Sequence, residues 1–241
     1  MAESIIYRQI PRPAAGLVDL LRGIPVADLH DEMDPIDRRR RLMSPGMRPL
    51  LPGRSIVGPA ATAYNSPGDN LMMHAALFFA EPGDVLVVSN GGVPHGALWG
   101  GNATTQATRK GVAGVVIDGP ARDTAQVRMH ESFGVWSTSV SVSRPTKELP
   151  GTANLPITCG GVLVNPGDIV VADEDGVIVI PPDQAERLAL AALERIRRDE
   201  RMQDAIRGGS TLFEQLSGFK QLERIGAEIR DGNWRDGTST N

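Results

Sequence analysis

The sequence predicts an α/β protein in which helices cover a sheet and a helical tail follows it. Three observations predict this class. Strand and helix patterns alternate between residues 56 and 118, which favours parallel strands with helices packed on the sheet. Short apolar strands separated by tight-turn sequences fill residues 155–180, as in a meander with tight corners. Residues 184–202 place an apolar stripe beside a charged face at helical spacing, which predicts an amphipathic helix.

In the first half, apolar periodicity and turn residues define the elements. The expected helices are residues 14–21, 26–33, 70–80 and 97–110, and the expected strands are residues 56–64, 85–89 and 112–118. Asn70 stands where a helix cap is expected. The basic run at residues 38–41 is expected to be a solvated loop, although it could also bind an acidic partner.

In the second half, turn chemistry separates the elements. The expected strands are residues 155–158, 162–164, 169–172 and 177–180, followed by helical stretches at residues 184–202 and 211–229. Pro-Gly-Asp precedes an apolar strand twice, at residues 82–84 and 166–168, which predicts the same turn at both places. The acidic run 173–175 lies between two strands, so it is interpreted as a hairpin turn rather than a metal cluster.

Length and composition favour one domain and exclude several functional classes. The chain has 241 residues, of which 41% are hydrophobic, enough for one substantial core. We therefore expect a single domain over residues 1–241, with an N-terminal helical arm (1–50), a sheet core (51–181) and a helical tail (182–241). A net charge of −4 and 4% aromatic residues argue against nucleic-acid binding. The lone Cys159 excludes an internal disulfide.

No apolar run is long enough to cross a bilayer, and the first residues lack the apolar core of a secretory signal. We therefore expect a cytoplasmic protein with no membrane partner.

The stretch from His95 to Asp123 carries the most chemistry. It reads as a glycine loop, a helix, a β-branched strand at residues 115–117 and a turn that ends in Arg122-Asp123. Gly119-Pro120 is expected to end the strand, which places both charged residues at its carboxyl end, where ligands collect in α/β proteins. Glycines before a helix start let the backbone approach an anion such as a carboxylate.

Simpler interpretations exist for the same residues. Arg122 and Asp123 alone could form an exposed ion pair, and Gly100-Gly101 could form only a tight loop. The histidines show no ligand spacing, and only His95 lies near the glycine loop in the sequence.

Three motifs together resemble the RraA-like family. They are PGDVLVVSNGG (82–92), GVAGVVIDGPARD (111–123) and CGGVLVNPGDIVVADEDGVIVIP (159–181). The family includes class II 4-hydroxy-4-methyl-2-oxoglutarate / 4-carboxy-4-hydroxy-2-oxoadipate aldolases and a ribonuclease E regulator. The resemblance implies a β/β/α swivelling-type domain assembled as a homotrimer or a dimer of trimers. It also implies active sites between subunits and, in the catalytic members, a divalent-metal-dependent lyase that handles pyruvate.

The resemblance also assigns roles to residues. Asp123 matches the aspartate that holds Mg²⁺ or Mn²⁺ largely through waters, and Arg122 matches the arginine that contacts the pyruvyl group. Glu200 is similar in position to a glutamate that reaches the metal waters of a neighbouring subunit. The loop whose N–H groups hold the substrate carboxylate corresponds to Gly100, Gly101, Asn102 and Ala103.

The sequence departs from the aldolase pattern at Gly101, where aldolases carry Asp or Glu for proton transfer. The Gly-Gly pair resembles the non-catalytic regulator. Asp118, Asn102 or a metal-bound water could take the place of the acid, and the sequence does not choose among them.

Two functions therefore stay open. The first is a metal-dependent lyase that cleaves a 4-hydroxy-2-oxo acid, or decarboxylates oxaloacetate, through a pyruvate enolate. The second is a regulatory binding protein without catalysis. Retro-aldol cleavage and decarboxylation leave the same enolate, so a cation and an arginine that stabilise its charge serve both reactions.

Overall fold

The computed structural model describes residues 4–234, and the chain forms two compact units, Met1–Leu193 and Glu194–Asn241. All strands of the described residues lie in the first unit. The single domain expected from the sequence stays a prediction. None of the helices within residues 4–234 combines the length and the apolar character needed to cross a membrane.

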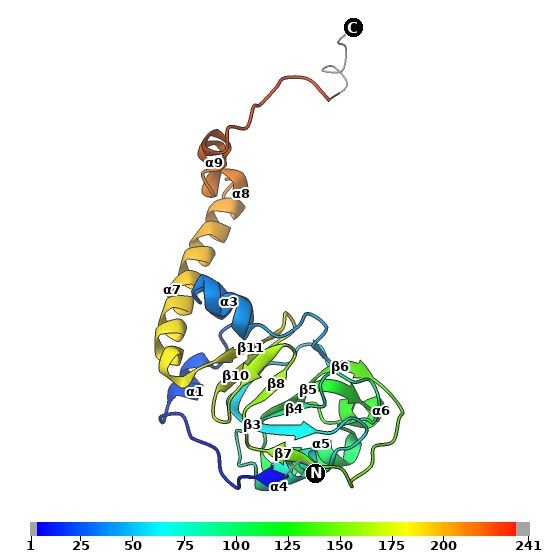
Figure 1. Ribbon diagram of the computed structural model, residues 1–241. Coiled ribbons are helices and arrows are strands. Elements are labelled where there is room, and N and C mark those ends of the chain that lie inside the picture. The colour runs from blue at the N-terminus through cyan, green and yellow to red at the C-terminus, as the bar shows by residue number, and fades with distance from the viewer. Residues whose placement is uncertain (1–3, 235–241) are drawn as a thin grey trace. The chain divides into compact units, whose positions relative to one another are not determined.

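A mixed sheet forms the centre of the first unit (Figure 1). Its strands, in spatial order, are β1 (Ile5–Ile6), β7 (Gly151–Ala153), β3 (Ile56–Asn65), β4 (Val85–Ser89), β5 (Gly114–Ala121), β6 (Gly134–Val140) and β2 (Arg48–Pro49). The expected parallel pairing is confirmed, because β3, β4, β5 and β6 are parallel neighbours. The sequence did not predict β1 and β2, which come from the region expected to be a helical arm and form the two edges.

A second β layer covers one face of this sheet. Strand β10 (Ile169–Ala172) pairs antiparallel with the first half of β3 and with β11 (Val177–Ile180). Strands β8 (Ile157–Cys159) and β9 (Val162–Val164) form a separate hairpin. One of the two buried hydrophobic clusters joins side chains of β8–β11 to the facing side chains of β4, β5 and β6. The short strands predicted after residue 155 are therefore confirmed in this layer, but they form two separate hairpins, β8–β9 and β10–β11, rather than the continuous meander expected.

Helices cover the opposite face of the sheet. They are α4 (Leu71–Phe79), α5 (Gly101–Lys110) and α6 (Thr124–Arg128), which Figure 1 shows together on the side away from β8, β10 and β11. Alternation along β4 divides the two cores: Val85 and Val87 face the β layer, whereas Leu86 and Val88 face the helices, as strand geometry requires. The resulting β/β/α order confirms the predicted fold class.

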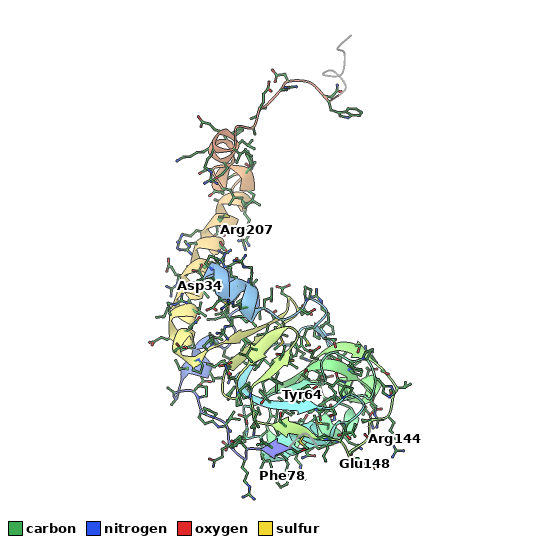
Figure 2. The ribbon with its side chains drawn as sticks, viewed as in Figure 1. Asp34, Tyr64, Phe78, Arg144, Glu148 and Arg207 are labelled. Atoms are coloured by element: carbon green, nitrogen blue, oxygen red, sulfur yellow. The ribbon has the colours of Figure 1, made fainter. Side chains whose placement is uncertain are left out.

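Six further helices complete the described chain: α1 (Leu17–Leu21), α2 (Val26–Asp31), α3 (Pro35–Arg41), α7 (Pro182–Arg207), α8 (Leu212–Gln215) and α9 (Gly218–Arg224). The prediction of a loop at residues 38–41 is wrong, because this run is the end of α3. Asp34, labelled in Figure 2, accepts hydrogen bonds from the N–H groups of Ile36 and Asp37, and Pro35 starts the helix without needing an N–H partner.

The helical stretch expected at residues 211–229 is also corrected. It is two short helices, because Ser217 adopts a left-handed conformation between α8 and α9.

The two Pro-Gly-Asp sequences form the same turn, as predicted. In each, the aspartate side chain accepts a hydrogen bond from the N–H group three residues earlier, Glu81 for Asp84 and Asn165 for Asp168. The acidic run 173–175 is a hairpin turn, as expected, in which Asp173 accepts from the N–H group of Asp175 at 2.9 Å.

Candidate active site

The glycine loop and the carboxyl end of β5 are joined by backbone hydrogen bonds. The N–H of Leu98 donates to the carbonyl of Pro120 at 2.8 Å, and the N–H of Arg122 donates to the carbonyl of Trp99 at 2.9 Å. The residues before α5 thus run parallel to the last residues of β5. This pairing places Gly100 next to Arg122 and Asp123.

Strand β5 does not end at Gly119-Pro120, so that prediction is wrong. The strand continues to Ala121 through an irregularity in its pairing with β6 between Ile117 and Pro120. Gly119 has a φ of 152°, which side chains rarely adopt, so glycine permits the bulge. The positions of Arg122 and Asp123 at the strand's carboxyl end are as predicted.

Asp123 adopts an unusual backbone conformation. It precedes α6 with φ 56° and ψ 38°, the left-handed region, and its side chain does not cap that helix. Instead Oδ2 accepts a hydrogen bond from the N–H of Gly101 at 3.2 Å and lies 3.4 Å from Nε of Arg122. A left-handed residue other than glycine costs about 1–3 kcal/mol and is found where surroundings or function require it.

These residues border a cavity of about 160 Å³. Its lining comprises Asn70, Met73, His74, Ala97, Trp99, Gly100, Asn102, Ala103, Arg122, Asp123, Pro145 and Lys147. Of the residues that the sequence selected, the structure brings Gly100, Asn102, Ala103, Arg122 and Asp123 to this cavity. Gly101 is buried and joins it only through its N–H group on Asp123.

The two glycines have different reasons to be glycine. A Cβ on Gly100 would lie 2.6 Å from Oδ2 of Asp123, so the missing side chain allows the carboxylate to approach. A Cβ on Gly101 would instead meet Gln126 of α6, at 2.8 Å from Cδ and 2.9 Å from Cβ. Gln126 therefore occupies the space into which a side chain at residue 101 would extend.

Asn70 occupies the N-cap position of α4 as expected, but its side chain makes no capping hydrogen bond. The preceding residue, Asp69, supplies the acceptor instead: its Oδ1 accepts from the N–H of Leu71, the first residue of α4, at 2.8 Å. Asn70 is 6% exposed and lines the cavity, and its Oδ1 has no hydrogen-bond partner within residues 4–234. A buried acceptor without a partner is costly for the fold, so this oxygen is available to a donor on a bound molecule.

His74 and Lys147 also line the cavity and were missed by the sequence interpretation. Burial, and then the charge of Lys147, lower the pKa of His74, so its imidazole is neutral near pH 7. One sequence signal could have located the side of the cavity that contains Asn70 and His74. The segment Asp69-Asn70 follows β3, and parallel strands end at the same edge of a sheet.

The oxygen ligands present fit a cation that keeps most of its waters. Asp123 offers one carboxylate, 40% exposed, at the cavity, and Mg²⁺ commonly binds through one or two carboxylates plus water and substrate oxygens. Residues 4–234 contain no group of three or more His, Cys, Asp or Glu side chains arranged around a common metal position. Asp123 would therefore hold a hydrated ion in an open site. Glu200 is exposed on α7, in the second unit, and its role toward a neighbouring subunit stays a prediction.

Other sequence candidates lie elsewhere. Asp118 accepts from the N–H of Gly160 at 2.9 Å and lines a different cavity beside Tyr64, so of the two residues proposed to replace the missing acid only Asn102 borders the cavity of Asp123. His95 hydrogen-bonds Ser143 and does not line that cavity. Cys159 is fully buried, and burial raises the pKa of its thiol, consistent with the structural role expected for it.

Comparisons with known proteins find a matching family model and named relatives. A family model described as RraA-like, Aldolase/RraA, matches residues 26–179. A relative from Halalkalibacterium halodurans, provisionally named a 4-hydroxy-4-methyl-2-oxoglutarate aldolase, is 34% identical over 77% of this chain and 86% of its own length. The 4-hydroxy-4-methyl-2-oxoglutarate aldolase of Thermus thermophilus is 37% identical over 47% of this chain and 68% of its own.

A solved structure has the same fold. Streptomyces coelicolor RraAS2, described as an unusual member of the RNase ES inhibitor RraA protein family, matches with a TM-score of 0.70 at 31% identity. The match covers 80% of this chain and 100% of that chain.

Proposed function

The chain belongs to the RraA-like, Aldolase/RraA family, and from this premise we propose that it is a divalent-metal-dependent lyase acting on a 2-oxo acid. The reaction is cleavage of a 4-hydroxy-2-oxo acid or decarboxylation of oxaloacetate, with pyruvate as a product. The cation is Mg²⁺ or Mn²⁺. Relatives named as aldolases support the reaction class.

The observation that carries the proposal is the conformation of Asp123. Its left-handed backbone turns the carboxylate away from α6, which it could cap, and toward the cavity beside Arg122. A fold that needed only a turn here would favour glycine or a capping geometry. A carboxylate directed to the cavity rather than to the helix supports a role toward a ligand.

The remaining residues suit an anionic 2-oxo acid. Asn102 and Ala103 lie in the first turn of α5, where N–H groups have no partner within the helix, so they can donate to a substrate carboxylate. The guanidinium of Arg122 supplies fixed positive charge where the 2-oxo oxygen becomes an enolate oxygen. When bound at Asp123, the cation would add Lewis-acid polarisation of that oxygen.

We infer further that the active assembly is a homotrimer or a dimer of trimers, in which Glu200 of a neighbouring subunit approaches the waters of the cation. The support is the family membership together with the exposed position of Glu200 on α7.

A second candidate function is a regulatory binding protein without catalysis. The observation that favours it is Gln126, which fills the space at Gly101 where aldolases of this family carry an acid. A protein of this kind would keep the cavity and lose proton transfer.

Pyruvate release by the parent separates the two functions, and Asp123→Asn tests the metal site, because asparagine tolerates the left-handed backbone and removes only the charge. The parent should release pyruvate from oxaloacetate or a 4-hydroxy-2-oxo acid only with Mg²⁺ or Mn²⁺, and the variant should lose about 10²-fold or more of this rate, since Lewis-acid polarisation contributes several kcal/mol. Calorimetry should show weaker metal binding with unchanged thermal unfolding. A parent that releases no pyruvate from either substrate would support the binding protein instead.

A further inference from the structure

The carboxylate of Asp69 connects two separate walls of the cavity. It is 1% exposed. Its Oδ1 accepts from the N–H of Leu71 at 2.8 Å, at the start of α4. Its Oδ2 accepts from the hydroxyl of Thr146 at 2.8 Å and from the N–H groups of Glu148 and Leu149 at 2.6 and 3.1 Å.

These bonds lie on both sides of Lys147. Thr146 precedes it and Glu148 follows it, and the two are held by the same carboxylate oxygen. Further backbone bonds join Thr146 to Gly68 and Asn70 at 2.8 and 3.2 Å. Figure 2 labels Arg144 and Glu148, which flank Lys147 in the sequence, at the edge of the first unit.

The contacts require an ionised carboxylate. All four groups that hydrogen-bond to the Asp69 side chain are donors: three backbone N–H groups and one hydroxyl. Burial by itself would raise the pKa of Asp69, but together the hydrogen bonds from Leu71, Glu148, Thr146 and Leu149 outweigh it, and the pKa lies below its ordinary value. An asparagine amide would present N–H groups to some of these donors and leave them without acceptors.

We propose that Asp69 is a positioning residue of the cavity: its carboxylate fixes the segment 146–149 against the start of α4 and so holds Lys147 beside His74 and Asn70. Lys147 is exposed and has a long flexible side chain, so its place at the cavity depends on the backbone that carries it. It is a cation of the cavity lining in addition to Arg122. This role rests on the proposed function, because it takes from that function that the cavity binds an anionic substrate.

A double-mutant cycle tests this role. Asp69→Asn, Lys147→Met and the double variant are titrated with 2-oxoglutarate by calorimetry in the presence of Mg²⁺; this dianion has no 4-hydroxyl group and is not cleaved. Asp69→Asn should weaken binding by about tenfold, the contribution of one hydrogen bond to a charged group. In the Lys147→Met background the same change should have less than a twofold effect.

Two further variants control for loss of stability. Thr146→Val removes one donor without touching the buried charge and should weaken binding in the same direction by a smaller factor. Asp84 is as buried as Asp69 and also accepts a backbone N–H. It precedes β4, at the amino-terminal end of the parallel strands and away from the cavity, and it pairs with Arg12. Asp84→Asn should leave the affinity unchanged.

The outcomes are distinguishable. Equal weakening by Asp69→Asn in both backgrounds, or equal weakening by Asp84→Asn, overturns the positioning role. A parent that binds 2-oxoglutarate but releases no pyruvate from cleavable substrates refutes the lyase and leaves the positioning role standing. If the parent does not bind the probe, amide exchange decides: faster exchange of residues 146–149 in Asp69→Asn supports the role, and unchanged exchange overturns it.

Discussion

Gly101 is the position at which the two proposed functions would differ. Its missing side chain is compensated by Gln126, whose Cβ, Cδ and Oε1 stand where a Cβ at residue 101 would lie. The two residues are therefore coupled, and a change at one requires a change at the other. A lyase without an acid here should decarboxylate oxaloacetate better than it cleaves an aldol, because loss of CO₂ needs no base to remove a hydroxyl proton.

The coupling predicts the result of restoring the acid. Gly101→Asp alone should lower the melting temperature, because the new Cβ lies 2.9 Å from the Cβ of Gln126. Gly101→Asp combined with Gln126→Gly should remove that contact and raise aldol cleavage by ~10²–10⁴-fold, the contribution of a positioned proton-transfer group. The ratio of pyruvate released from a 4-hydroxy-2-oxo acid to that from oxaloacetate is the measurement. Gln126→Gly alone is the control and should leave this ratio unchanged.

At the scale of elements, the bulge in β5 determines where the site residues lie. Leu98 pairs with Pro120 and Arg122 pairs with Trp99, so the register at the end of the strand sets the distance between the glycine loop and Asp123. Thr138 of β6 accepts the N–H of Gly119 at 2.9 Å. The irregular strand end is thus hydrogen-bonded rather than frayed. A substitution at Gly119 should therefore lower both the stability of the protein and its affinity for the metal.

Gly119→Ala should destabilise the protein by roughly 1–3 kcal/mol from backbone strain, with an added cost from contacts. Its Cβ would lie 2.7 Å from Cδ1 of Leu98 and 2.8 Å from Oδ1 of Asn90. Chemical denaturation measures the stability, and calorimetry should show weaker Mg²⁺ binding because Asp123 shifts.

Gly161→Ala is the control for this substitution. Gly161 also has a positive φ, 82°, but no atom lies within 4 Å of its Cβ position, so it should show the strain alone and normal metal binding. Equal loss of stability in the two variants would contradict the role given to the contacts of Gly119.

At the scale of the molecule, the second unit buries little of its apolar surface. Within its described residues, 194–234, Gly218 is the buried one. Its large exposed apolar side chains are Ile206, Leu212, Phe213, Leu216, Phe219, Ile225, Ile229 and Trp234. Contiguous exposed apolar surface marks interaction sites, and the oligomer proposed above would cover these side chains.

Light scattering at micromolar concentration should therefore report a trimer or a hexamer for the full chain. Removal of residues 209–241 should lower the number of subunits in the assembly, because it deletes the apolar side chains of α8 and α9. It keeps Glu200 on α7. A full-length chain that is a monodisperse and fully active monomer would contradict this prediction.

Local chemistry allowed the sequence by itself to determine the fold class, the strands β4, β9, β10 and β11 to the residue, and the repeated Pro-Gly-Asp turn. Apolar periodicity and turn residues act over a few neighbours, so they are visible in the printed chain. The same reasoning placed Arg122 and Asp123 at a strand end.

Tertiary structure alone decided the rest of the cavity. Asn70, His74 and Lys147 come from two segments that Asp69 joins across the fold, and Gln126 reaches Gly101 only because α5 and α6 pack together. The edge strands β1 and β2 are two residues each, too short to show a pattern. Contacts between residues distant in the chain depend on register and packing, and those are determined only when the whole core forms.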